Sequence, residues 1–286
     1  MTGKTTRWPA PAKLNLFLHV TGQRDDGYHT LQTVFQFVDW CDWLTFEINQ
    51  TGEISRTGNL KLADNDDLCL SAARLLQQTS QTGLGVTIHL EKNLPVGGGL
   101  GGGSSDAATT LLALNKLWQL AYSPDQLARL GLELGADVPV FIHGQSAFAQ
   151  GVGELLEPVQ LELPWFVIAV PPVVVSTRAI FSDPQLTRSS PTITIRDLNE
   201  SLSAADNKLG NDLELIVRRR HPEVDGAMKW LSQFGRVRMT GSGACVFLPV
   251  ANRDKAEEIA GLCPPEMVCH IARGLNEHPA RRELLL

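Results

Sequence analysis

A dense run of glycine lies near the middle of the 286-residue chain. Six of its 25 glycines fall within residues 97–103, in the segment PVGGGLGGGSSDAA. Glycine at this density permits positive φ angles and lets backbone N–H groups approach a ligand that side chains would otherwise block. A helix is expected to begin directly after the run, and a helix start adds unpaired N–H groups and the positive end of the helix dipole. The run therefore predicts a polyphosphate site held by the backbone.

Familiar phosphate-binding motifs do not explain this run. A Walker loop requires GxxxxGK[ST], and no lysine follows the last glycine. Gly97, Gly99 and Gly102 satisfy GxGxxG, but a Rossmann unit needs a second strand after the helix, where this sequence has a second capped helix at Ser123. The protein-kinase signatures are absent as well. A flexible linker is the remaining alternative, although linkers seldom join a strand to a capped helix.

A lysine and an aspartate stand in apolar surroundings outside the glycine run. Lys13 lies in AKLNLFLHV and Asp137 in LELGADVPVFI, where a charged side chain is uncommon unless it is paired or takes part in chemistry. The carboxylate could accept the proton of an alcohol, and the lysine could hold that carboxylate and stabilise a transferring phosphate. A structural ion pair explains the same residues, and the residues alone do not decide between the two interpretations.

The composition excludes several classes of function. The chain has 25 basic and 31 acidic side chains and a net charge of −6, so we expect neither a nucleic-acid partner nor a membrane surface, which both attract an excess of Lys and Arg. No apolar run approaches the ~18 residues of a membrane span, and no secretory signal precedes Pro9. The five cysteines form no CxxC or zinc pattern and predict reduced thiols in a cytoplasmic protein.

Two elements would position the residues described above. Residues 12–20 alternate as a half-buried strand, which places Lys13 and Asn15 on one face about 7 Å apart. After the glycines, an apolar stripe predicts a helix that a polar residue at 104–106 could cap. Lys13 and the glycine run therefore each lie on or beside a regular element.

The remaining elements mix strands and helices without strict alternation, which indicates an α+β protein of two lobes. Strands are expected at 33–39, 43–48, 86–90, 166–170 and 267–272, with a hairpin at 236–250, and helices at 123–135, 195–202, 211–233 and 252–262. We place the boundary between the two domains after residue 158, which gives domains at 1–158 and 159–286. The sequence leaves open whether residues 273–286 pack on the first lobe.

Three segments together resemble the GHMP kinases, a family that includes galactokinase, homoserine kinase, mevalonate kinase and phosphomevalonate kinase. PVGGGLGGGSSDAA is similar to the family's central phosphate loop, PAKLNLFLHVTGQRDDGYHTL to its N-terminal motif, and MTGSGACVF at 239–247 to its C-terminal glycine motif. The resemblance implies a two-lobed GHMP kinase fold, with an N-terminal lobe like domain 2 of ribosomal protein S5 and a ferredoxin-like C-terminal lobe. The domain at 1–158 would then bind ATP, the domain at 159–286 would lie on the substrate side, and the active site would lie between the lobes.

The resemblance also implies an ATP-dependent kinase that acts on an alcohol. Lys13 and Asp137 match the family's catalytic lysine and aspartate, which favours the catalytic interpretation of the pair. ATP would be the phosphate donor and would carry Mg²⁺, and no obligate protein partner would be needed. The implied nucleotide site consists of Lys92, Pro95, Val96, Gly97, Gly98, Gly99, Leu100, Gly101, Gly102, Gly103, Ser104 and Ser105. An exposed surface lysine is the alternative for Lys92, and ordinary helix capping is the alternative for the serines.

Within the family, the motifs imply a small-molecule substrate that carries a cytidine diphosphate group. Tyr28, His29 and Phe181 match residues that stack on and read the base, and Asn15 suits a hydroxyl of the sugar alcohol. Ordinary packing, or a turn in the case of His29, is the alternative for these residues. The metal ligands stay open, because Glu133 and Glu154 are candidates only by default.

Two other functions are compatible with these residues. One is a GHMP kinase with a different alcohol substrate, which would have no use for an aromatic pair around a base. The other is a nucleotide-binding protein without activity, although such a protein would have no need to retain Lys13 and Asp137.

Overall fold

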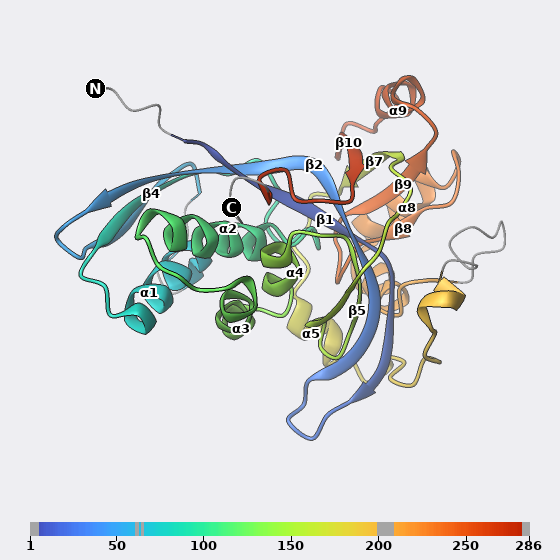
Figure 1. The fold of residues 1–286 in the computed structure, drawn as a ribbon. Coiled ribbons are helices and arrows are strands. Elements are labelled where there is room, and N and C mark those ends of the chain that lie inside the picture. The colour runs from blue at the N-terminus through green and yellow to red at the C-terminus, as the bar shows by residue number, and fades with distance from the viewer. Residues whose placement is uncertain (1–5, 61–62, 64–65, 199–208, 282–286) are drawn as a thin grey trace.

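The computed structural model describes residues 6–60, 63, 66–198 and 209–281, and these form two lobes (Figure 1). Helices α1 and α2 lie against the strands of the first lobe, and α3 and α4 pack on α2. In the second lobe α8 and α9 lie against the strands, and α7 packs on α8. The first half of the chain contains β1 (Trp8–Gln23), β2 (His29–Asn49), β3 (Ile54–Gly58), α1 (Leu68–Ser80), β4 (Gly85–Glu91), α2 (Gly102–Leu117), α3 (Pro124–Leu134), α4 (Val138–His143), β5 (Ala147–Gln150) and β6 (Leu155–Pro158). The second half contains β7 (Trp165–Val170), α5 (Thr177–Phe181), α7 (Glu214–Arg220), α8 (Pro222–Leu231), β8 (Arg238–Met239), β9 (Val246–Val250), α9 (Arg253–Ala260) and β10 (Val268–Leu275).

The strands of the described residues form one sheet, in which β10 connects the two lobes. The order is β3-β4-β2-β10-β7-β9-β8, and β1 and β5 attach to β2. Most of β10 pairs with β7, but Gly274 and Leu275 at its end pair with β2 of the first lobe. Ala280, farther along, is buried in the core of that lobe. The described part of the C-terminal segment therefore does pack on the first lobe, a point that the sequence left open.

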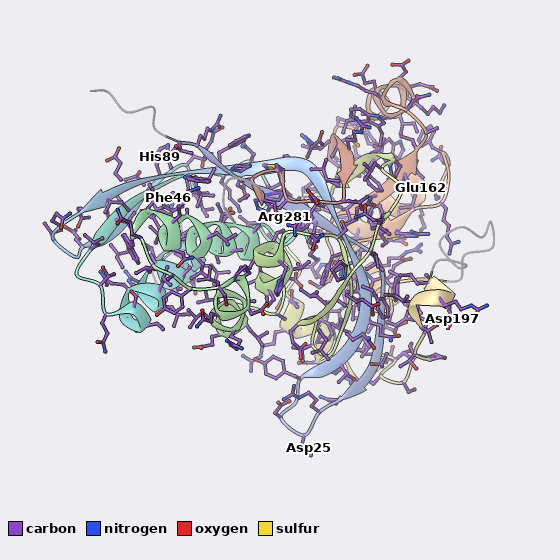
Figure 2. All side chains as sticks on the ribbon, in the orientation of Figure 1. Asp25, Phe46, His89, Glu162, Asp197 and Arg281 are labelled. Atoms are coloured by element: carbon purple, nitrogen blue, oxygen red, sulfur yellow. The ribbon has the colours of Figure 1, made fainter. Side chains whose placement is uncertain are left out.

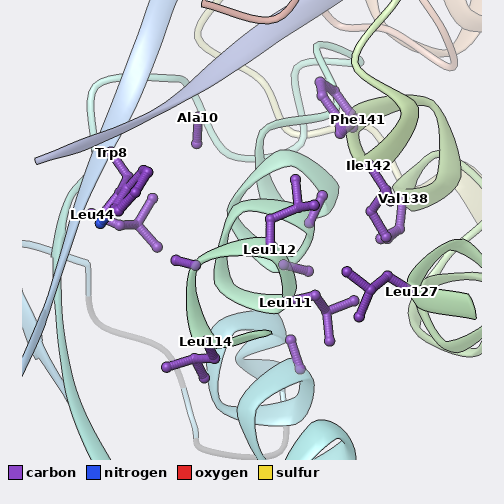
Figure 3. Close-up of a cluster of buried hydrophobic side chains, with 14 of the residues drawn as sticks. Trp8, Ala10, Leu44, Leu111, Leu112, Leu114, Leu127, Val138, Phe141 and Ile142 are labelled. Carbon is purple, nitrogen blue, oxygen red and sulfur yellow. The ribbon is translucent and has the colours of Figure 1, made fainter. Parts of the chain in front are cut away.

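Helix α2 lies in the centre of the first lobe's core (Figure 3). Of the apolar stripe expected after the glycine run, Ala107, Leu111 and Leu114 are fully buried and Leu117 is partly buried, because α1, α3, α4 and the sheet pack around the helix. This packing fixes the N-terminus of α2, and with it the glycine run that precedes the helix. The parallel pair β3 and β4, joined through α1, forms a βαβ unit in the same lobe.

The strand predicted at 12–20 is confirmed as part of β1, but the prediction that it is half-buried was wrong. Lys13 and Leu14 point to opposite faces, as neighbours on a strand do, and both are buried; Leu14 shares a core with Ile168 of β7 in the second lobe. The simple alternation is also interrupted, since the register with β2 shifts between Asn15 and Leu18. A strand that is covered by one lobe on each side needs apolar residues on both faces.

Several boundaries also differ from those that the sequence suggested. The strands expected at 33–39 and 43–48 are one continuous strand, β2. The helix expected at 211–233 divides into α7 and α8 at Pro222, which begins α8 because proline fits the first helical position. The segment expected to be helical at 195–202 is helical over 195–198, and 199–202 lie outside the described residues. The predicted capping box of α3 and the β8–β9 hairpin are confirmed.

No helix in the described ranges combines the length and apolar character that a bilayer crossing requires.

Candidate active site

A cavity of about 1380 Å³ is lined by residues of both lobes, including β1, the glycine run, α5 and the β8–β9 turn. It brings together all but one of the residues that the sequence singled out for catalysis, nucleotide binding and substrate binding. Lys13, Asn15, Tyr28, His29, Lys92, Pro95, Val96, Gly97, Gly98, Gly99, Leu100, Gly101, Gly102, Gly103, Ser104, Asp137 and Phe181 all line it. Ser105 does not, because it faces the protein interior and is fully buried.

Lys13 and Asp137 form an ion pair on one wall of this cavity. The Lys13 Nζ atom lies 3.3 Å from Oδ2 of Asp137, at the start of α4. Nζ also donates to Oδ1 of Asn15 at 2.5 Å and to the carbonyl oxygen of Gly99 at 3.0 Å. The Lys13 side chain is 3% exposed, whereas that of Asp137 is 33% exposed. The lysine is therefore held in place on several sides, while the carboxylate can be reached by a ligand.

Asn15 shares the face of Lys13, as predicted, but most of its hydrogen-bonding groups are already used. Its Oδ1 accepts from Lys13, and its Nδ2 donates to Oγ1 of Thr33 at 2.9 Å. The backbone N–H of Asn15 donates to Oγ1 of Thr240, which in turn donates to the carbonyl oxygen of Gly99. Asn15 thus orients Lys13 directly, and one amide hydrogen is left for a substrate.

The glycine run adopts turns that only glycine fits well. Gly97, Gly99 and Gly101 have φ angles of +70°, +75° and +71°. A Cβ atom on Gly99 would come within 2.2 Å of the carbonyl oxygen of Thr240. The backbone N–H of Cys245 donates to the carbonyl oxygen of Gly98 at 3.1 Å, so the C-terminal glycine motif supports the loop from the second lobe.

The prediction that a polar residue at 104–106 caps the following helix was wrong. Helix α2 begins at Gly102, and its N-cap is Gly101 in the left-handed conformation, with no side-chain cap. The first N–H groups of the helix therefore have no side chain to accept from them, as an anion site requires. Ser104 lines the cavity, and the Oγ of Ser105 is buried without a partner among the described residues.

Lys92 is not the exposed surface lysine that we kept as an alternative. Its side chain is 9% exposed, and Nζ donates to Oδ2 of Asp42 at 2.5 Å and of Asp106 at 2.6 Å. Burial alone would lower the pKa of Lys92, but Asp106 and Asp42 together outweigh burial and raise it. Burial also raises the pKa of Asp106 to about 7, against the opposing effect of Lys92. Since a Cβ on Gly102 would lie 3.1 Å from Nζ, this cluster packs directly under the helix start.

The aromatic residues lie where the β1–β2 turn faces α5. Asp25 marks the tip of this turn (Figure 2), and Tyr28 beside it is 64% exposed. The rings of His29 and Phe181 are 5.2 Å apart between centroids, at an angle of 40°. Burial, and then the positive charge of Arg188, lower the pKa of His29. The site thus offers an exposed aromatic ring next to a neutral imidazole.

Sequence reasoning missed Arg188, Thr240 and Thr177. Nε of Arg188 lies 3.0 Å from Nε2 of His29, across 159 positions of sequence, and no local signal announces that contact. Thr240 stands inside the glycine motif TGSG and could have been noticed there. Oγ1 of Thr177 lies 2.7 Å from Oγ of Ser242, so α5 is tied to the same motif.

The described residues contain no group of three or more His, Cys, Asp or Glu side chains that could hold a metal ion. Glu133 and Glu154, the candidates by default, do not line the cavity. Glu154 instead accepts from the backbone N–H of Val152 at 2.6 Å. Oxygen-bearing side chains that line the cavity singly include Ser104 and Asp137.

Comparison of the sequence with known proteins gives matches within one family. Residues 67–145 match the model of the GHMP kinases N terminal domain, and residues 193–261 match that of the GHMP kinases C terminal domain. The chain is 51% identical to the 4-diphosphocytidyl-2-C-methyl-D-erythritol kinase of Shewanella denitrificans, over 97% of this chain and 96% of that protein. It is 52% identical to the kinase of the same name from Thiobacillus denitrificans, over 95% of this chain and 96% of that protein.

Solved structures agree with these sequence matches. A crystal structure of 4-(cytidine 5'-diphospho)-2C-methyl-D-erythritol kinase superposes with a TM-score of 0.80 at 32% identity, covering 94% of this chain and 99% of that chain. The mevalonate kinase of Methanococcus jannaschii, at 16% identity and a TM-score of 0.66, covers 96% of this chain and 100% of that chain and shows the shared fold alone. The two-lobed α+β fold expected from the sequence motifs is confirmed.

Proposed function

Since the chain belongs to the GHMP kinase family, we propose that it phosphorylates the 2-hydroxyl of 4-diphosphocytidyl-2-C-methyl-D-erythritol with ATP, giving the 2-phosphate and ADP. This reaction belongs to the non-mevalonate pathway of isoprenoid precursor synthesis. One observation supports the proposal above others: the Lys13–Asp137 pair lines the same cavity as the glycine loop and the His29–Phe181 pair. A loop that can bind the phosphate donor, a side chain that can accept a proton and a group that can read a base thus share one site.

The chemistry that we assign to this pair is proton transfer and charge stabilisation. Asp137 accepts the proton of the substrate's 2-hydroxyl, and the oxygen attacks the γ-phosphorus of ATP as the bond between that phosphorus and the β–γ bridging oxygen breaks. ADP leaves with the electrons of that bond. Lys13 holds the Asp137 carboxylate in place and stabilises the negative charge on the transferring group. Asn15 and the carbonyl of Gly99 hold Lys13 where it can do both.

We assign ATP binding to the loop at 95–103 and to the first turn of α2. The left-handed glycines expose backbone N–H groups, and the uncapped helix start adds more of them. Mg²⁺ usually keeps several waters and binds through substrate phosphates and one or two protein oxygens, which suits a cavity that offers Ser104 and Asp137 singly. When bound, the ion would neutralise charge on the β- and γ-phosphates.

We assign the cytidine end of the substrate to Tyr28, His29 and Phe181. An exposed tyrosine can stack on a base, and a neutral histidine can hydrogen-bond to the base edge. Phe181 belongs to the proposed substrate-side domain at 159–286, whereas Lys13, Asp137 and the glycine loop belong to the domain at 1–158. The cavity residues come from one chain, so we propose that no partner is needed to complete the site. The five free cysteines favour a reducing compartment, which we propose is the cytoplasm.

The direct test is ADP release in the presence of the cytidine substrate. Asp137→Asn should lower kcat by at least about 1000-fold, since both general-base catalysis and the correct charge are lost, while ATP binding changes little. Asp125→Asn, on the exposed first turn of α3, is the matched control and should retain normal turnover. Near-normal activity of Asp137→Asn would refute the assignment of the base.

Competition with cytidine 5'-monophosphate separates the proposed substrate from another alcohol. If the His29 end binds cytosine, this nucleotide should inhibit competitively against the cytidine substrate. No inhibition, together with turnover of an alcohol that lacks a base, would favour a GHMP kinase of different specificity. No ADP release with any alcohol would favour a nucleotide-binding protein without activity.

A further inference from the structure

Arg188 connects the two residues that we assign to base recognition. Its Nε donates to Nε2 of His29 at 3.0 Å, and its Nη2 donates to the carbonyl oxygen of Phe181 at 3.1 Å. Its remaining hydrogen bonds go to the carbonyl oxygens of Asp183, at 2.9 Å, and Leu186, at 3.2 Å. One guanidinium therefore holds the end of α5, the loop that follows it and the histidine at the start of β2.

The direction of the Arg188–His29 hydrogen bond determines which nitrogen of the histidine carries hydrogen. A guanidinium can only donate, so Nε2 must be the unprotonated, accepting nitrogen of a neutral imidazole. The single ring hydrogen of His29 then resides on Nδ1. In the part of the chain that the structure describes, Nδ1 has no hydrogen-bond partner in the protein. His29 therefore presents a donor, and no acceptor, to a ligand in the cavity.

The neutral state of His29 agrees with its surroundings. Burial and the adjacent positive charge of Arg188 both hold the pKa of His29 below its ordinary value. A protonated ring would place two positive charges side by side and would lose the acceptor that Arg188 needs. Arg188 thus acts on both the charge and the tautomer of the ring.

A fixed donor distinguishes the two common pyrimidines. Cytosine has a lone pair on N3 next to the O2 acceptor, whereas uracil carries a hydrogen on N3. A donor at Nδ1 can pair with N3 of cytosine but faces a second donor on uracil, and sites that leave a buried polar group unpaired reject the wrong ligand strongly. The other tautomer, with Nδ1 as an acceptor, would reverse this preference.

We propose that Arg188 is a positioning residue that fixes the Nδ1–H tautomer of His29 and thereby makes the site select cytosine over uracil. This inference rests on the proposed function, since it assumes that a cytidine group occupies the His29 end of the cavity. Arg188 contacts no reacting atom in the proposed reaction and acts through His29.

The decisive variant is Arg188→Met, which removes every donor but keeps an unbranched side chain as far as the position of Nε. The inhibition constants of cytidine and uridine 5'-monophosphate, measured against the cytidine substrate, give the base discrimination. We expect the preference for cytidine to fall by about tenfold or more. The KM of the cytidine substrate should rise, while kcat and the KM of ATP stay within about threefold, because the phosphoryl-transfer groups are untouched.

Two controls separate a tautomer effect from a general loosening of the loop. In a His29→Ala background, Arg188→Met should cause no further loss of discrimination, because the two residues act as one unit. Arg219→Met removes contacts to Asp183 and Gln185 of the same loop without touching His29, so its discrimination should equal that of the wild type. Unchanged discrimination in Arg188→Met, or an equal loss in Arg219→Met, would overturn the proposal.

The tautomer itself can be measured in the wild-type protein, which keeps the test valid if Arg188→Met fails to fold. The ¹⁵N chemical shifts of the imidazole, assigned by comparison with His29→Ala, should show hydrogen on Nδ1. Hydrogen on Nε2 would overturn the proposal. If the wild type releases no ADP with the cytidine substrate, the proposed function fails. If the wild type does release ADP but the Nδ1–H tautomer of His29 is absent, only the role of Arg188 fails.

Discussion

Gly99→Ala tests whether the shape of the glycine loop is set by its contact with the second lobe. Gly99 has a φ of +75°, and an added Cβ would lie 2.2 Å from the carbonyl oxygen of Thr240 and 3.0 Å from that of Gly243. Gly103→Ala is the matched control from the same run. Gly103 lies in α2 without a positive φ, and its added Cβ would meet only Leu68 Cδ1, at 3.3 Å.

The cost of Gly99→Ala follows from these distances. Real Cβ atoms essentially never approach another heavy atom closer than 3.0 Å, so the loop and Thr240 must separate by 3.0 − 2.2 = 0.8 Å or more. The left-handed conformation costs alanine about 1–2 kcal/mol. The separation also strains the hydrogen bonds that Lys13 and Thr240 donate to the Gly99 carbonyl, each with a net contribution of about 0.5–1.5 kcal/mol. We expect a total loss of about 2–4 kcal/mol, whereas alanine in the first turn of α2 costs nothing or stabilises by up to about 1 kcal/mol.

The displacement should affect catalysis more than folding. Because Lys13 is bonded to the Gly99 carbonyl, a shift of this size moves both the phosphate loop and the lysine, and a misplacement of about 1 Å can cost roughly 100-fold in rate. Urea unfolding gives the stability change, and ADP release gives kcat. If Gly99→Ala kept wild-type stability and a kcat within a few-fold of normal, the contact with Thr240 would not determine the loop's shape.

Two further predictions concern buried side chains that can carry a charge. Lys92→Met leaves Asp42 and Asp106 buried without a counter-charge, so the free energy of unfolding in urea should fall by about 3–5 kcal/mol, against less than about 0.5 kcal/mol for the exposed Lys229→Met. His278 is buried, and burial lowers its pKa from 6.5 to about 3, so it stays neutral in the fold while the unfolded chain takes up a proton below pH 6.5. Its contribution to stability is therefore lost as the pH falls from about 6.5 to 3, at up to about 1.4 kcal/mol per pH unit. His278→Asn, whose side chain can still accept from the N–H of Ala280, should flatten this slope in urea titrations at pH 7 and pH 5, and an unaltered slope would contradict the assignment.

Features encoded by neighbouring residues could be predicted from the sequence. The capping box of α3 needs only Ser123 and Gln126, and proline at its first position reinforces the same start. The glycine run was informative for the same reason, because its left-handed turns are local. The cap of α2 was predicted wrongly since Gly101 takes that position, and the serines behind it are turned to the cavity and the core.

Contacts between distant segments could not be predicted in this way. Lys92 looked like a surface residue because its two carboxylate partners, Asp42 and Asp106, are 50 and 14 positions away. The burial of both faces of β1 depends on the second lobe, which forms from residues more than 150 positions later in the chain. Arg188 is the clearest example, since nothing near residue 188 indicates that its guanidinium reaches the start of β2.

The backbone recognition that we propose would explain how a chain with a net charge of −6 binds two polyphosphate ligands. Besides Arg178 and Arg188, the cavity is lined by two lysines that are paired with carboxylates of the protein itself: Lys13 with Asp137, and Lys92 with Asp42 and Asp106. Their charge is therefore mostly offset before any ligand arrives. Backbone N–H groups in left-handed turns and at a helix start are fixed dipoles that need no counter-ion, so they attract phosphate without altering the overall charge balance. Affinity then depends on the position of each N–H group, which is why a single methyl group on Gly99 should cost this site more than the loss of an exposed charge.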